Sequence, residues 1–296
     1  MMIAAIRKSI SSLKKDREHG AGWLTAQALE ILREAASLDP AGSTSSLLSS
    51  LNGVVSALIG ARPSIVSIAN YALYFQSEVE TAAATCKSPQ RLKKAAYSIA
   101  DRLIRRQQKS AAAAARSAAA LVGKRSIIMT CSYSSTVCSA LELARRGGRD
   151  FKVLAAQSLY KKISYGEMVL RRLQESGISG RIVPDSQIGW HAARADLVLC
   201  GADCVSLHGW LLNGTPALEL AETAVRKKRP FYVVGETTKI DARGLTAGLP
   251  VSEPGFDRVP LEMISGLVTE KGMIKPDEIY EFTIEDLAGS MRDRTR

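Results

Sequence analysis

The hydrophobic period of this 296-residue chain changes near residue 126. Before that point, apolar residues recur every three or four positions, a spacing typical of amphipathic helices. Beyond it, short apolar runs alternate with helical segments: SIIMTC, FKVLAA, GRIVP, ADLVLCGA and PFYVVGE. Strands that are apolar on both faces and alternate with helices indicate a parallel sheet covered on both sides. We therefore predict a helical amino-terminal domain over residues 1–122 and a Rossmann-like, doubly wound parallel-sheet α/β domain over residues 123–296.

Turn and capping residues divide the amino-terminal domain into helices. The first helix carries one apolar stripe, made of Ile3, Ile6, Ile10 and Leu13. We expect this stripe to pack on the domain rather than on a membrane surface. Pro63 is placed to open a later helix, and Ser88 with Pro89 to start a long one. No uninterrupted run of about 18 apolar residues occurs, so we expect no membrane-spanning helix.

The composition is that of a folded protein with reduced cysteines. Hydrophobic residues make up 46% of the chain and charged residues 23%, as in ordinary globular domains. The five cysteines include no CxxC pair, which argues against both a disulfide framework and a zinc site. We expect a cytoplasmic protein that carries no metal and no cofactor.

The formal net charge of +11 indicates either an anionic partner or solvated helix faces. Many of the cations lie within one helical segment, between residues 87 and 116. Neither interleaved aromatic residues nor a known nucleic-acid module accompanies them, so nucleic acid is the less favoured partner. We expect solvated helix faces together with an attraction for phosphorylated small molecules.

Doubly wound sheets bind their ligands beyond the carboxyl ends of the strands. Four segments should therefore border one crevice: 131–135, 157–160, 203–214 and 236–239. Asp203 ends the fourth apolar run, and an acid buried there without a partner would cost several kcal/mol. We expect its carboxylate to meet a hydrogen-bond donor or a hydroxyl group of a ligand.

The turn TCSYSST, after the first predicted strand, offers an anion site. Its hydroxyls and the free N–H groups of a helix start suit a phosphate, although simple N-capping uses the same residues. Cys131 is the candidate nucleophile, because a helix amino terminus lowers the pKa of a thiol. The alternative is a buried and inert cysteine at a strand end.

The stretch HGWLLNGTP combines a histidine with a turn. Thr215 and Pro216 are placed to cap and open a helix, which leaves the polar Asn213 before them unexplained. His208 is either an acid/base group that contacts the ligand or a solvated turn residue.

A second glycine-containing stretch, DREHGAGW, lies near the amino terminus. Gly20 and Gly22 permit close approach of the backbone to a phosphate, and Arg17 and His19 add hydrogen-bond donors.

Together these stretches resemble one family, which unites the initiation factor 2B α, β and δ subunits with the methylthioribose-1-phosphate and ribose-1,5-bisphosphate isomerases. GADCVSLHGWLLNGTPALELA is similar to its GAD-x4-NG-x3-NKIGT-x3-LA signature, and PFYVVGETTK to the PFYV and lysine that follow. REHGAG resembles its RGAG segment, ARPSIVSIAN its RPT-like helix, and TCSYS its T-H-(C/S)-x-S turn. The resemblance implies a helical domain, a Rossmann-like domain, and homodimers or larger assemblies built through the latter.

The resemblance also implies roles for individual residues. The isomerases move protons between C1 and C2 of a sugar phosphate with a cysteine of the T-H-C turn and the aspartate of GAD. Asp203 matches that aspartate, whereas Cys131 falls under the family's histidine and Ser132 under its cysteine. Ser132, Tyr133 and Ser134 are similar to the S-Y-S of the regulatory subunits, which lack isomerase activity. A hydroxyl is a poor substitute for a thiol in acid/base work near neutral pH.

Other positions depart from the family's pattern. His208 replaces the asparagine of NG, and Asn213 remains without the lysine that follows it in the family. Gln157 stands for the acid of TETRP, and His19 for the arginine of RGAG. Because this chain lacks cationic residues at these family positions, we do not expect it to bind a bisphosphate with the family's residues. The crevice would have to use other cations: Arg17, Lys161 or Lys239.

Two functions remain open. The first is an initiation factor 2B-like, regulatory or non-classical protein that binds a phosphorylated sugar or nucleotide in the interdomain cleft. Its ligand-binding residues would be Arg17, His19, Gly20, Ala21, Gly22, Ser132, Tyr133, Ser134, Gln157, His208, Asn213 and Lys239. The alternative is an aldose–ketose isomerase on a phosphorylated sugar, with Asp203 and Cys131 as its acid/base pair.

Overall fold

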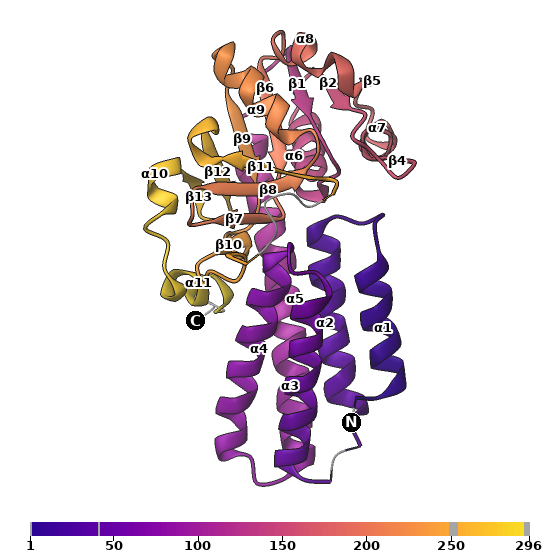
Figure 1. Ribbon diagram of the computed structural model, residues 1–296, viewed down its shortest axis with the longest axis vertical. Helices are drawn as coiled ribbons and strands as arrows, with labels where there is room; N and C mark the ends of the chain where they lie inside the picture. The colour runs from indigo at the N-terminus through magenta and orange to yellow at the C-terminus, as the bar shows by residue number, and fades with distance from the viewer. Residues whose placement is uncertain (1, 41, 249–253, 293–296) are drawn as a thin grey trace.

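The computed structural model of the chain describes residues 2–40, 42–248 and 254–292. The first part of the described chain is helical, and its helices stand side by side in the lower half of Figure 1. They are α1 (Ala4–Lys15), α2 (Ala21–Leu38), α3 (Thr44–Ala61), α4 (Val66–Thr85) and α5 (Pro89–Ala119). This arrangement confirms the helical region that the sequence predicts before residue 126.

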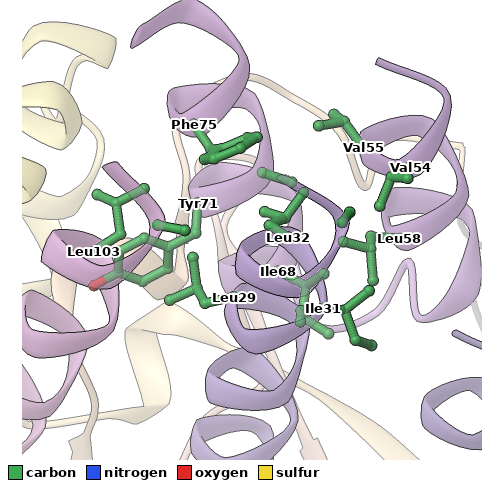
Figure 2. Close-up of a cluster of buried hydrophobic side chains, with 14 of the residues drawn as sticks. Leu29, Ile31, Leu32, Val54, Val55, Leu58, Ile68, Tyr71, Phe75 and Leu103 are labelled. Atoms are coloured by element: carbon green, nitrogen blue, oxygen red, sulfur yellow. The ribbon is translucent and has the colours of Figure 1, made fainter. Parts of the chain in front are cut away.

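The helices share one hydrophobic core. Ile6, Ile10 and Leu13 of α1 are buried in it, as predicted for the first helix. Figure 2 shows side chains of the other helices gathered in this core, among them Leu32, Leu58, Phe75 and Leu103. Burial of such large side chains is the main stabilising contribution to a helical bundle of this kind.

Helix α3 is the one helix of the described residues that is long and apolar enough to cross a membrane, with a mean hydropathy of 1.3. A single helix of this kind is weak evidence for a membrane span, because a core helix passes the same test. The buried side chains of α3 lie in the bundle core: Leu47, Leu51, Val54, Val55 and Leu58.

Local capping explains where α5 begins, but not where α4 begins. Ser88 accepts a hydrogen bond from the N–H of Arg91 at the start of α5, with Pro89 in the first turn, as predicted. The prediction for Pro63 was wrong, because α4 begins only at Val66. Pro63 lies in a turn that the Ile65 N–H closes on the Arg62 carbonyl at 3.0 Å.

A seven-stranded sheet follows, with the strand order β13-β12-β9-β6-β1-β2-β5. The five predicted runs form five neighbouring parallel strands of this sheet: β1 (Ser126–Thr130), β2 (Phe151–Ala156), β5 (Gly180–Val183), β6 (Leu197–Gly201) and β9 (Phe231–Val234). The sequence did not predict the last two strands. β12 (Gly266–Thr269) lies parallel to β9, and β13 (Gly272–Ile274) pairs antiparallel with β12.

The strand order fixes where a ligand can bind. From β1 the chain proceeds to β2 and β5 on one side, and then returns to β6 on the other side of β1. The connecting helices are α6 (Ser135–Arg146), α7 (Tyr165–Glu175), α8 (Ile188–Ala192) and α9 (Ala217–Arg226), with short helical turns η1 (Asp185–Gln187), η2 (Thr237–Lys239) and η3 (Leu261–Met263). The order therefore reverses between β1 and β6, and this reversal is the topological switch point at which such folds bind ligands.

A second, smaller sheet was not predicted. Its order is β10-β7-β8-β11, and it consists of β7 (Cys204–Ser206), β8 (Trp210–Gly214), β10 (Ile240–Asp241) and β11 (Phe256–Pro260). The stretch expected to be a glycine-rich turn is in fact the hairpin β7–β8. Another short hairpin joins β3 (Leu159–Tyr160) to β4 (Ile163–Ser164).

Two helices join the helical and the α/β parts. The carboxyl-terminal end of α5 packs through Ala114, Ala115 and Ala118 into the core beneath α6. After α10 (Pro276–Ile279), helix α11 (Ile284–Met291) returns to the bundle and buries Leu287 and Met291 in its core. Figure 1 shows α11 lying beside the upper end of the helices. The domain division at residue 122 stays a prediction.

Candidate functional site

A cavity of about 210 Å³ lies between the helical part and the switch point. We call it the switch-point cavity. Residues before and at the start of α2, and in the turn before α4, form one wall: Arg17, His19, Gly20, Ala21, Arg62 and Ile65. The α/β part supplies the other wall: Ser132, Tyr133, Tyr160, Tyr165, Asp203, Gly214, Pro254, Gly255 and Phe256. The crevice expected beyond the strand ends therefore exists between the two parts.

Asp203 follows β6 and borders the cavity. Its N–H donates to the Leu212 carbonyl at 2.9 Å, which fastens the residue to β8. Partial burial raises the pKa of Tyr165; Arg17 and Arg62 oppose this rise, and Asp203 adds to it. These three charged groups are thus near enough to the Tyr165 hydroxyl to act on it.

Two guanidinium groups meet at a single carbonyl oxygen. Nη1 of Arg17 donates to the Asp16 carbonyl at 2.7 Å, and Nη1 of Arg62 donates to the same oxygen at 2.6 Å. The Tyr165 hydroxyl donates to the carbonyl of Arg17 at 2.7 Å and so joins the two walls. Two like charges fixed side by side at a cavity wall favour an anion between them.

His19 is held in place by its neighbours. Its Nδ1 lies 2.8 Å from Oδ2 of Asp16, and its ring stacks on Trp23 with the centroids 3.7 Å apart. Gly20 beside it packs tightly, because a Cβ there would lie 3.0 Å from the Tyr133 carbonyl oxygen. The glycine-containing stretch before α2 therefore approaches the turn after β1 closely.

Ser132 has a left-handed backbone with φ of 56° at the cavity. This region is unusual for a residue other than glycine. The Ser132 N–H donates to Oγ of Ser158 at 2.8 Å, which helps to hold the conformation. Opposite lies Gly214, where a Cβ would be only 2.3 Å from the Ser132 Oγ. Ser134 caps α6 by accepting the Val137 N–H at 3.3 Å, so at this position the capping alternative applies.

Cys131 lies below the cavity rather than on its wall. It is buried, its Sγ is 3.4 Å from Sγ of Cys200, and Asn213 Nδ2 donates to it at 3.8 Å. The hydrogen bond with Cys200, followed by burial, raises the pKa of Cys131 well above its ordinary value. The geometry therefore favours the buried-cysteine alternative, and it gives Asn213 a partner.

A narrow recess of about 10 Å³ adjoins the cavity. It shares the cavity residues Gly20, Ala21, Tyr133 and Asp203, and it adds Gly22, Ser134, Asn213 and Lys239. Nζ of Lys239 lies 3.5 Å from Oε2 of Glu236, and both side chains are buried. A space of this size holds about one water molecule, so these residues lie behind the cavity.

Two of the expected ligand contacts line neither space. His208 is exposed in the turn of the hairpin β7–β8, and the hairpin carries it away from Asp203. Gln157 uses its backbone instead, with its N–H donating to the Val183 carbonyl at 2.8 Å. Among the described residues, no group of three or more His, Cys, Asp or Glu side chains could hold a metal ion.

Several cavity residues were missing from the candidates. Arg62 belongs to ARPSIVSIAN, a stretch singled out only for its resemblance to a family helix. Tyr160 lies within the predicted crevice segment 157–160, and its side chain lines the cavity, although no motif in the sequence indicates this residue. Tyr165 opens α7 and reaches the cavity only through the hairpin β3–β4, a contact that no local pattern indicates.

The model of the Initiation factor 2 subunit family matches residues 17–247, which is more than half of the chain. The chain belongs to this family. The matched segment includes the stretch before α2, the turn after β1, and Asp203. The residues that line both walls of the switch-point cavity up to Gly214 therefore lie within the family match.

Curated relatives within this family carry two kinds of name. A Pyrococcus furiosus protein described as a putative translation initiation factor eIF-2B subunit 2-like is 27% identical over 93% of this chain and 98% of its own length. A Methanocaldococcus jannaschii ribose 1,5-bisphosphate isomerase is 22% identical over 96% of both chains. The chain is therefore similar both to a protein described as an initiation-factor subunit and to one described as an isomerase.

Solved structures of the family share the fold. The Pyrococcus horikoshii translation initiation factor eIF-2B has a TM-score of 0.82 at 24% identity, over 93% of this chain and 98% of that one. A subunit of the tetrameric eIF2B-beta2-delta2 complex from C. thermophilum has a TM-score of 0.79 at 17% identity, over 98% of this chain and 95% of that one. These likenesses confirm a helical region followed by a mostly parallel α/β sheet.

Proposed function

We propose that this member of the Initiation factor 2 subunit family binds a phosphorylated sugar or nucleotide in the switch-point cavity and acts as a regulatory, non-classical protein. The observation that carries the proposal is the pair of guanidinium groups, from Arg17 and Arg62, on the Asp16 carbonyl oxygen. Guanidinium groups present fixed N–H donors that match the oxygen atoms of a phosphate.

The rest of the cavity suits the sugar of such a ligand. Asp203 is an acceptor for hydroxyl groups, and Ser132 is both a donor and an acceptor. Tyr133, Tyr160 and Phe256 supply aromatic surface. A ligand that joins a phosphate to a ring with several hydroxyl groups would use both kinds of group at once.

The alternative, an aldose–ketose isomerase, keeps Asp203 but lacks a suitable partner for it. Acid/base work near neutral pH needs a group whose pKa lies near the working pH. Cys131 is buried with a raised pKa, and Ser132 offers a hydroxyl in place of the family's thiol. The isomerase name of the M. jannaschii relative is the reason to keep this alternative for testing.

Assembly and location are further parts of the proposal. Because the related C. thermophilum subunit belongs to a tetrameric complex, we propose a homodimer or larger homo-oligomer for this chain. We propose a cytoplasmic location, since all five cysteines are free and a reducing compartment keeps them so.

Ligand binding is tested on the full chain by isothermal titration calorimetry with ribose 5-phosphate, ribose 1,5-bisphosphate and AMP. We expect at least one to bind, and Arg62→Ala to weaken it by about tenfold or more, as loss of a charge-assisted contact does. The control is Arg171→Ala, an exposed arginine on α7 that does not line the cavity. Failure of all three ligands to bind would sink the proposal.

Turnover separates the two functions. Ribose 1,5-bisphosphate and methylthioribose 1-phosphate are incubated with the chain, and the ketose product is measured. We expect no turnover. Product that disappears in both Asp203→Asn and Cys131→Ala, while both variants keep the wild-type melting temperature, would establish the isomerase instead.

A further inference from the structure

The connection from β5 to β6 leaves part of the main sheet uncovered. It consists of η1 and the five-residue helix α8, which is about 7.5 Å long, whereas α6 has 12 residues and α7 has 11. Ile188 and Ala192 of α8 are buried against the sheet. A helix this short cannot cover the full length of β1, β2 and β5.

A pocket of about 440 Å³ occupies the uncovered area, over the amino-terminal halves of these strands. We call it the α8 pocket. Figure 1 shows α8 at the end of the α/β part that is remote from the helical bundle. The switch-point cavity lies at the opposite, carboxyl-terminal ends of the strands, so the two spaces are separate.

The α8 pocket combines an apolar floor with an aromatic wall. Ile127 of β1 and Leu154 of β2 form the floor. Trp190 of α8 lines the pocket and is 56% exposed. The guanidinium of Arg194 lies 3.7 Å from the centroid of the indole ring and donates to the Trp190 carbonyl at 2.8 Å. A flat cationic surface is therefore fixed on the aromatic side chain.

The charges around the pocket have one sign. Lys152, Arg181 and Arg194 line it, and among the lining residues that the structure describes there is no Asp or Glu. Asp196, which lies next to the pocket in the chain, accepts the Ile127 N–H at 2.9 Å. Burial, followed by the charges of Arg181 and Arg194, lowers the pKa of His191, which also lines the pocket.

We propose that the α8 pocket binds a small molecule that carries both a flat ring system and a phosphate or carboxylate group. The ring would lie on the apolar floor and on the stacked Arg194, because guanidinium planes stack on aromatic rings. The anionic group would lie between Lys152 and Arg181, which offer charge-assisted hydrogen bonds. The volume is in the usual range for small-molecule sites.

Charge argues against a second copy of the chain as the occupant. In a twofold-symmetric contact the same patch meets itself, so Lys152, Arg181 and Arg194 of both copies would be brought together. Like charges juxtaposed in this way cost several kcal/mol. An anionic ligand instead neutralises the patch.

The test titrates the full chain with 1-naphthyl phosphate, and separately with the uncharged 1-naphthol, in calorimetry and by quenching of tryptophan fluorescence. We expect the phosphate to bind about tenfold more tightly than naphthol. Lys152→Glu and Arg181→Glu should each weaken the phosphate by tenfold or more. The matched control is Arg171→Glu, which makes the same charge change on an exposed residue of α7. In Trp190→Ala, the probe should no longer cause a saturable quenching of tryptophan fluorescence.

Four results would overturn the proposal. One is equal binding of naphthol and naphthyl phosphate, and another is an equal effect of Arg171→Glu and Arg181→Glu. A third is a loss of probe binding in Arg62→Ala together with unchanged probe binding in the α8-pocket variants. This result would assign the probe to the switch-point cavity. The fourth is a Trp190→Ala variant that changes the oligomeric state in sedimentation experiments but not the binding of the probe.

Discussion

Sγ of Cys131 lies 3.4 Å from Sγ of Cys200, on the adjacent strand of the main sheet and below the switch-point cavity. Each residue is only 1% exposed. One thiol is hydrogen-bonded to the other, and this bond together with burial raises the pKa of Cys131. Burial also raises the pKa of Cys138 to about 12. Neither group carries the thiolate that nucleophilic or acid/base work requires.

One cysteine should therefore react with a thiol reagent in the folded chain, and the other four should not. Cys86 is half-buried, and Cys131, Cys138, Cys200 and Cys204 are buried. We expect Ellman's reagent to release about one equivalent rapidly from the folded chain at pH 8, and all five in denaturant. Cys86→Ala should remove the rapid phase. A rapid phase of two or more equivalents would contradict the buried placement of at least one of the other four cysteines, and its loss in Cys131→Ala would assign it to Cys131.

Gly214 should tolerate no side chain. A Cβ at this position would lie 2.3 Å from the Ser132 Oγ and 2.8 Å from its Cβ, so the Ser132 turn would have to move. We expect Gly214→Ala to cost about 1–3 kcal/mol of unfolding free energy and to weaken ligand binding in the cavity. Urea denaturation measures the first effect and calorimetry the second.

Gly60 provides the control for this substitution. It lies in α3, and a Cβ there would meet nothing within 4 Å. Gly60→Ala should stabilise the chain by up to about 1 kcal/mol, since alanine favours a helix. If Gly214→Ala behaved like Gly60→Ala, the close approach of Gly214 and Ser132 would be wrong.

The sequence predicted β1, β2, β5, β6 and β9 because each is a short, mostly apolar run that alternates with helical segments. It failed at the hairpin β7–β8, where Cys204–Ser206 is too short to show an alternating pattern. Strands β12 and β13 were not predicted for a similar reason: MISGLVTEKGMI shows only an apolar segment, whereas in the structure Gly272 takes the turn between two short paired strands with φ of 106°. Short strands owe their existence to pairing partners that no local window contains.

The start of α9 shows the same limit in a helix cap. The sequence places Thr215 as the cap, but no side-chain cap is formed within the helix. Asp257 of β11 caps the helix instead. Its carboxylate accepts hydrogen bonds from the Leu218 N–H at 3.1 Å and from the Thr215 hydroxyl at 3.1 Å. The local prediction was wrong because the capping carboxylate comes from a distant strand.

Asp257 should therefore matter more to stability than Thr215. We expect Asp257→Ala to cost about 1–2 kcal/mol of unfolding free energy, in the range of lost helix caps. Thr215→Ala should cost less, because it leaves the Leu218 N–H satisfied. Equal costs for the two variants in urea denaturation would contradict this, because they would show that the bond to Leu218 N–H adds nothing beyond the bond to the Thr215 hydroxyl.

The sequence predicted those residues of the candidate site whose position follows from the strand order alone. Asp203 and Ser132 border the cavity because the loops after β6 and β1 flank the switch point. Arg62 was missed because it reaches the cavity through packing of the helical part on the sheet. His208 lines neither space because the unpredicted hairpin β7–β8 holds it in an exposed turn, which favours the solvated-turn alternative.

His191 should make stability depend on pH. Burial and the charges of Arg181 and Arg194 lower its pKa below the ordinary 6.5. As the pH falls below that value, His191 binds a proton in the unfolded chain more readily than in the folded chain. The free energy of unfolding therefore decreases. The loss is at most about 1.4 kcal/mol per pH unit. It should set in near neutrality, above the range in which ordinary carboxylates titrate.

Glutamine at position 191 tests this dependence, because its amide oxygen can still accept the hydrogen bond that Arg181 donates to Nδ1 at 3.1 Å. We expect His191→Gln to flatten the loss of stability in urea denaturation between about pH 7 and pH 5.5. His208→Gln, at an exposed histidine, should leave the wild-type slope unchanged. A slope that survives in His191→Gln would place the titrating group elsewhere, and would remove the pKa support for a cationic α8 pocket.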